Sequence, residues 1–133
     1  MNIESLRQHC LSFPRCTEHV QWGDNLVFKV GGKMFAVAAL DPASPHRVAF
    51  KCTPEDFAEL TERDGIIPAP YLARAQWVSV ERWNALRDSD LLALLRTAYD
   101  LVYDKLPRKV KATLDAAPAR TLPGKKKRKA TRS

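Results

Sequence analysis

Two glycines between two strand-forming runs are the feature that most constrains the fold of this chain. Residues 25–30 and 33–40 are rich in apolar and β-branched side chains, and Gly31 and Gly32 separate them. A tight two-residue turn requires positive φ angles, which glycine adopts without steric conflict. The sequence therefore predicts a β-hairpin, and with it an antiparallel sheet.

Helices and further strands are indicated on both sides of this hairpin. Apolar side chains three and four residues apart predict a short helix over 2–12 and a long helix over 89–104. Thr53 and Pro54 are typical of a helix start, and Pro107 can begin a last short helix. Three more strands are expected, at 47–52, 71–72 and 76–80. The order α-β3-α-β2-α predicts an α+β two-layer sandwich, with an antiparallel sheet and helices packed on one face.

The charge of the chain is concentrated at its C-terminal end. The 133 residues include 22 Lys and Arg and 15 Asp and Glu, for a formal net charge of +7. Residues 1–115 hold all 15 acidic side chains and an equal number of basic ones, so this part is neutral. The other seven basic side chains lie in residues 116–133, which are rich in Lys, Pro and Ala. We therefore expect a folded domain over 1–115 and a disordered basic tail over 116–133.

Composition also bears on cellular location. No run approaches the ~20 apolar residues that span a bilayer, and the N-terminus lacks the basic-then-apolar plan of a signal peptide. The three cysteines, Cys10, Cys16 and Cys52, are odd in number and form no Cys-x-x-Cys motif. This pattern is typical of buried thiols in a reducing compartment. We expect a cytoplasmic monomer that does not associate with membranes.

One short segment contains the residue types that bind zinc. His9, Cys10, Cys16 and His19 lie within eleven residues. His9 and Cys10 are adjacent on the predicted helix and point about 100° apart, so both can hardly face one ion. We therefore expect no metal, and we expect no other cofactor.

The sequence contains no recognisable catalytic set. Cys52 precedes a helix start, but His46 lies about 20 Å away if the intervening residues are extended. The glycine pair closes a hairpin and does not open a helix, so it does not form a phosphate-binding loop. We therefore expect a protein that is not an enzyme.

Basic side chains are the candidate functional residues. Lysine and arginine that neutralise phosphates release counterions, so they bind nucleic acid without reading its sequence. A solubilising tail, an address signal and a solvated helix end are alternative explanations of the same charges. The candidates are Lys29, Lys33, Lys51 and Arg74 near the predicted strands, Lys105, Arg108, Lys109 and Lys111 near the end of the long helix, and Lys125, Lys126, Lys127, Arg128 and Lys129 in the tail.

An ordered set of short motifs resembles the MmcQ/YjbR family over about residues 2–114. The set includes Trp22-Gly23, Phe28-Lys-Val30, Lys33-Met-Phe-Ala36, Lys51-Cys-Thr-Pro-Glu55, Gly65-Ile-Ile-Pro-Ala69, Trp77-Val78 and Leu106-Pro-Arg-Lys109. The resemblance implies a small α+β sandwich similar in topology to CyaY and to the "double wing" DNA-binding domain of a phage transcription factor. It implies DNA binding and no catalytic residues. The basic tail lies outside it.

The expectation is thus a non-enzymatic protein that binds nucleic acid, with DNA rather than RNA as the expected partner. The alternative is a protein-interaction or small-ligand-binding module whose partner is unknown. The sheet face that carries no helices discriminates between them. Clustered Lys and Arg on that face would favour nucleic acid, and apolar side chains would favour a protein partner.

Overall fold

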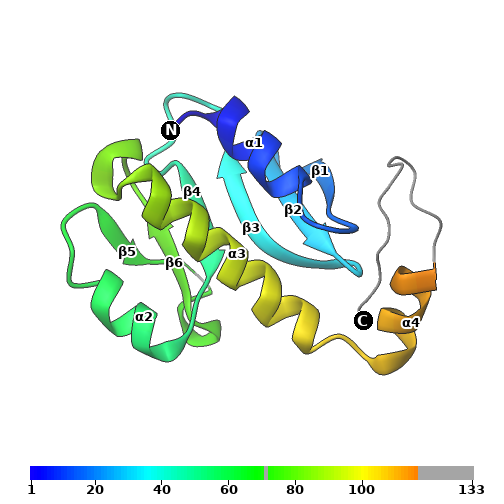
Figure 1. Cartoon of the computed structure of the whole chain (residues 1–133). Helices are drawn as coiled ribbons and strands as arrows, with labels where there is room; N and C mark the ends of the chain where they lie inside the picture. Colours follow the sequence, from blue (N-terminus) through cyan, green and yellow to red (C-terminus); the bar gives the residue numbers. More distant parts are fainter. Residues whose placement is uncertain (71, 117–133) are drawn as a thin grey trace.

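A computed structural model of the chain describes residues 1–70 and 72–116 (Figure 1). The elements follow one another as α1 (Ile3–Leu11), β1 (Thr17–Gln21), β2 (Asn25–Val30), β3 (Lys33–Ala39), β4 (Val48–Lys51), α2 (Pro54–Leu60), β5 (Ile66–Pro68), the 3₁₀ turn η1 (Ala73–Ala75), β6 (Trp77–Val80), the 3₁₀ turn η2 (Trp83–Ala85), α3 (Asp88–Asp104) and α4 (Arg108–Ala116).

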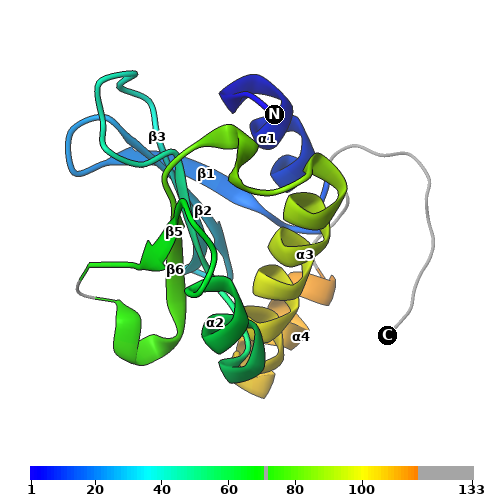
Figure 2. The ribbon, with the colours of Figure 1, turned by 90° about the vertical axis from the view of Figure 1, so that its left-hand side faces the viewer.

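The described strands form one antiparallel sheet in the order β1-β2-β3-β4-β6-β5. Figure 2 shows α1, α2, α3 and α4 on the same side of this sheet. This arrangement confirms the expected α+β two-layer sandwich with helices on one face. Within the described residues, no helix combines the length and the apolar character needed to cross a membrane.

Two strands differ from the sequence prediction. β1 was not expected, because Val20 is its only strongly apolar side chain and Val20 is itself 62% exposed. A strand was expected at 71–72, but Leu72 lies in a turn in which its N–H donates to the Ala69 carbonyl. The strand that pairs with the outer side of β6 is β5, which precedes the expected position. Pro68 can end it because β5 is an edge strand, where a missing N–H interrupts no ladder.

The core lies between the sheet and α3. Phe28, Phe35 and Phe50 come from three neighbouring strands and are fully buried against Leu95 and other apolar side chains of α3. Burying an aromatic or leucine side chain stabilises the fold by about 1.5–3 kcal/mol. These contacts therefore hold α3 on the sheet.

The predicted glycine turn joins β2 to β3 as expected. Gly31 and Gly32 have φ angles of +60° and +81°, which residues other than glycine, asparagine and aspartate rarely adopt. A Cβ on Gly31 would lie 2.6 Å from Cδ1 of Leu106, in the link between α3 and α4. The turn therefore packs directly against the end of the helical layer.

Candidate nucleic-acid interface

Chain direction brings basic residues from separate strands to one end of the sheet. β2 ends and β3 begins at the glycine turn, which places Lys29 and Lys33 beside it. β4 is antiparallel to β3, so its last residue, Lys51, lies at the same end. Strand pairing alone thus gathers three of the candidate side chains.

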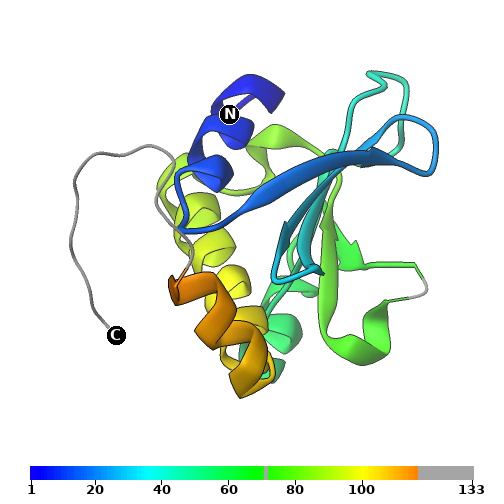
Figure 3. The ribbon, with the colours of Figure 1, turned by 90° about the vertical axis from the view of Figure 1, so that its right-hand side faces the viewer.

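Helices and a loop add basic residues to the same end. In Figures 1 and 3, α4 (orange) follows directly on the end of α3 (yellow). A Cβ on Gly31 would lie 2.6 Å from Leu106 and 3.1 Å from Val110, so the β2–β3 turn lies against the start of α4. Nζ of Lys51 donates a hydrogen bond of 2.7 Å to the Ala75 carbonyl, which places η1 and Arg74 beside β4. Nζ of Lys111 donates to the Asp104 carbonyl at 3.0 Å.

We call the resulting surface the basic end. It comprises eight predicted side chains: Lys29, Lys33, Lys51, Arg74, Lys105, Arg108, Lys109 and Lys111. Glu55, Asp56 and Asp104 lie near it, because α2 begins and α3 ends there. Basic charge therefore exceeds acidic charge at this end, although residues 1–115 are neutral as a whole. The five predicted tail residues, Lys125 to Lys129, lie outside the described residues.

Two features place positive charges close together at this end. Burial lowers the pKa of Lys51, and the positive charge of Lys105 lowers it further. The first turn of α4 contains Arg108 and Lys109 and no acidic residue, at the helix end where the backbone dipole is already positive. Lys51, Lys105 and the dipole of α4 would all favour binding of an anion here.

The face of the sheet opposite the helices, here called the open face, has a different character. Residue pairing aligns one side chain from each strand into a single row, here called the central row: His19, Val27, Val37, Ala49, Ser79 and Ile67. Four of these six side chains are apolar. Beside the central row, towards the basic end, lie Lys29 and Lys51. Sequence reasoning singled out those two lysines and missed the row.

His9, Cys10 and Cys16 are placed as packing residues. Nε2 of His9 lies 3.3 Å from the Leu92 carbonyl, and its ring meets Phe13 edge-on. Burial raises the pKa of Cys10 far above its usual range and raises that of Cys16 to about 12. Such thiols stay protonated at neutral pH. Within the described residues, no group of three or more His, Cys, Asp or Glu side chains could hold a metal ion.

Cys52 is also a poor nucleophile. It is buried at the end of β4, and its thiol lies 3.4 Å from the Gln76 carbonyl. Burial raises its pKa to about 11, with a further contribution from Asp56. A catalytic thiol needs the opposite shift.

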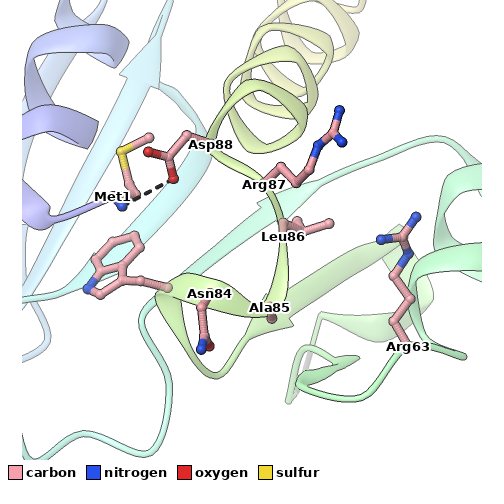
Figure 4. Close-up of a pocket in the computed structure, with 8 residues that line it drawn as sticks. Met1, Arg63, Asn84, Ala85, Leu86, Arg87 and Asp88 are labelled. Atoms are coloured by element: carbon pink, nitrogen blue, oxygen red, sulfur yellow. Dashed lines mark hydrogen bonds and ion pairs between the residues drawn. The ribbon is translucent and has the colours of Figure 1, made fainter.

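Two cavities lie beside the first half of α3. The larger, of about 390 Å³, is shown in Figure 4, where the amino group of Met1 contacts Asp88 at 3.1 Å. Its lining is Met1, Arg63, Trp83, Asn84, Ala85, Leu86, Arg87 and Asp88. The smaller, of about 270 Å³, lies between α2 and α3 and is lined by acidic and apolar side chains and by Arg63. Neither lining contains a histidine or a cysteine, so neither pairs a nucleophile with a histidine base.

Comparison with solved structures supports this fold assignment. The chain is similar to protein DR2400 of Deinococcus radiodurans, a DUF419 domain, with a TM-score of 0.75 and 29% identity over 85% of this chain and 87% of that one. It also matches a protein of Pseudomonas syringae in fold, with a TM-score of 0.64 and 20% identity over 76% of this chain and 98% of that one.

Comparison with curated proteins gave no match. The family model YjbR matches residues 11–101, which include all six described strands and most of α3. The basic side chains from Lys105 to Lys111 follow the matched region. The resemblance seen in the sequence motifs is therefore confirmed, and the chain belongs to the YjbR family.

Proposed function

We propose that this protein is a non-enzymatic DNA-binding protein whose basic end and C-terminal tail contact phosphates. The observation that carries the proposal is the convergence of eight basic side chains from β2, β3, β4, η1 and the α3–α4 region at one end of a neutral domain. Phosphate contacts of this kind position a protein on DNA but do not read base sequence. We therefore propose binding without strong sequence preference.

The domain over residues 1–115 and the tail make separable contributions to DNA binding. The seven tail cations alone would give a log–log salt slope of about −6 on duplex DNA, from 0.9 per phosphate contact. They would bind DNA even if the domain did not. A test of the proposal therefore has to remove the tail charge first.

The test is a fluorescence-anisotropy titration of a labelled 20-base-pair duplex at several salt concentrations. One full-length variant carries Gln at the seven basic tail positions. A second adds Lys33→Gln, Lys105→Gln and Lys109→Gln, three exposed residues of the basic end. A matched control adds Arg63→Gln, Arg82→Gln and Arg87→Gln instead, which remove equal charge from exposed side chains away from that end.

We expect the tail variant to retain measurable binding at low salt, with a shallower salt slope. The basic-end triple variant should bind the duplex at least tenfold more weakly than the tail variant, and the affinity of the control triple variant should differ from that of the tail variant less than threefold. The proposal fails if the tail variant does not bind DNA at low salt. It also fails if the control weakens binding as much as the basic-end variant does.

A further inference from the structure

The open face contains polar atoms that are buried but have no partner. Oγ of Ser79 and Oε1 of Gln21 are inaccessible to water and form no hydrogen bond within the described protein. Ser79 is 1% exposed and lies in the central row, with Ala49 on one side and Ile67 on the other. Leaving such a group unpaired destabilises a protein by about 1–3 kcal/mol. A partner that moves the covering side chains aside and completes these hydrogen bonds would remove that penalty.

The central row is exposed only in part: Val27 and Ser79 are buried, and a partner can contact the side chains on either side of Ser79. Ala49 and Val37 are small and partly exposed, and Ile67 is 38% exposed at the edge of the sheet. Across six strands about 4.8 Å apart, the central row extends for roughly 24 Å. It is thus a long, shallow strip, whereas the two cavities described above lie on the other side of the molecule, beside α3. A strip of this shape fits a segment of a macromolecule better than a small molecule.

The charged side chains and the aromatic ring of the open face indicate which class of macromolecule it can bind. Lys29 and Lys51 lie beside the central row on the same face, and no strand residue of that face is acidic. Trp77, opposite Lys51 on this face, is only 4% exposed, so its ring offers no platform on which a base could stack. Apolar side chains flanked by lysines match a partner with apolar and acidic side chains.

We propose that the open face docks an acidic, amphipathic segment of a partner protein. The apolar side chains of that segment cover the central row, a polar group of it pairs with Ser79, and its carboxylates pair with Lys29 and Lys51. This inference does not rest on the proposed DNA binding. The two surfaces share Lys29 and Lys51, but the central row belongs to the open face alone.

The test uses random 16-residue peptides displayed on phage and selected against the full-length protein. Enriched peptides are synthesised, and their affinity is measured by fluorescence anisotropy. We expect them to combine Asp or Glu with Leu, Ile or Phe. Ala49→Glu, in the central row, should weaken their binding at least tenfold. Ala58→Glu, at an exposed position of α2 on the opposite side, is the matched control and should leave binding within twofold.

Two further variants separate docking from folding. Ile67→Glu lies at an exposed edge position, so it tests the same row even if Ala49→Glu unfolds the sheet. Ser79→Ala should lower peptide affinity at least threefold while leaving the unfolding midpoint unchanged or higher, because the hydroxyl has no partner in the free protein.

The inference is overturned if no acidic peptides are enriched, or if Ala49→Glu and Ile67→Glu bind the enriched peptides as well as Ala58→Glu does. It is also overturned if a 16-nucleotide single strand binds the tail variant and Ala49→Glu abolishes that binding, because the face would then recognise nucleic acid. Failure of the tail variant to bind duplex DNA at low salt would overturn only the proposed function and would leave this inference unaffected.

Discussion

Two adjacent glycines in one turn have different tolerances for a side chain. Gly31 and Gly32 both have positive φ, at which an L-residue is disfavoured by roughly 1–2 kcal/mol. A Cβ on Gly32 meets nothing within 4 Å, but a Cβ on Gly31 collides with Leu106. The backbone conformation thus requires both glycines, and packing adds a second requirement at Gly31 alone.

We therefore expect Gly32→Ala to lower the free energy of unfolding by about 1 kcal/mol and Gly31→Ala to lower it further, by about 2–3 kcal/mol in total. Urea denaturation followed by circular dichroism measures both. Equal losses for the two variants would show that the contact with Leu106 is easily relieved.

Trp22 is a bulky residue in a conformation that suits glycine or asparagine. Its φ is +50°, and Gly23 follows at +81°, at the tip of the β1–β2 hairpin. The side chain is 62% exposed, so it contributes little packing to the fold. The packing of the Trp22 side chain therefore does not offset its backbone strain, and the stability of the fold does not require tryptophan at this position.

Because asparagine tolerates this conformation, Trp22→Asn should raise the free energy of unfolding by about 0.5–1 kcal/mol. The comparison variant is Val20→Asn, at an equally exposed position in β1, which should lower it because asparagine disfavours strands. A loss of stability in Trp22→Asn, seen in the same denaturation assay, would contradict the account of strain.

At the scale of single elements, α2 begins at a cap that the sequence already specifies. Oγ1 of Thr53 accepts a hydrogen bond of 3.1 Å from the Asp56 backbone N–H, and Pro54 occupies the first helical position. Glu55 and Asp56 then lie at the positive end of the helix dipole. These local interactions explain why a helix of only seven residues starts at this point.

Thr53→Ala should therefore lower the free energy of unfolding by about 1 kcal/mol. Thr113→Ala removes a threonine whose hydroxyl bonds the Lys109 carbonyl on the exposed surface of α4, and it should change stability by less than half as much. Thermal unfolding of the two variants side by side tests this difference. Equal effects would mean that the cap does not stabilise α2.

At the scale of the whole molecule, burial of the cysteine thiols and of the Tyr99 hydroxyl lowers the stability of the fold at alkaline pH. Burial raises the pKa of Cys16 to about 12 and of Cys52 to about 11, and it raises the pKa values of Cys10 and Tyr99 still further. The folded state therefore holds these protons to higher pH than the unfolded chain does. Stability is complete below the ordinary thiol pKa and falls as pH rises through 9 towards 12.

We expect the free energy of unfolding to fall between pH 7.5 and pH 10, by roughly 1–2 kcal/mol for each of these thiols. Urea denaturation at several pH values measures this slope, and Cys52→Ala should reduce it. A free energy that stays constant or rises over this range would show that the buried groups ionise as readily in the folded protein as in the unfolded one.

The sequence alone determined the features that depend on neighbouring residues. Glycine φ preferences determined the β2–β3 hairpin, the Thr53 cap and Pro54 determined the start of α2, and apolar spacing determined α3. The same local patterns could not reveal β1, which has one strongly apolar side chain, or β5, which ends in proline. Those strands form because a neighbouring strand pairs with them.

The candidate surfaces were decided by tertiary structure. The sequence identified Lys29, Lys51 and Lys105 as basic residues, but only the sheet order and the packing of the glycine turn on Leu106 bring them to one end. Likewise, the alternation of Val78, Ser79 and Val80 indicates that Ser79 faces away from the core, yet the central row requires the register of five strand pairs. Local conformational preferences act between residues close in sequence, whereas a surface depends on which distant segments pack together.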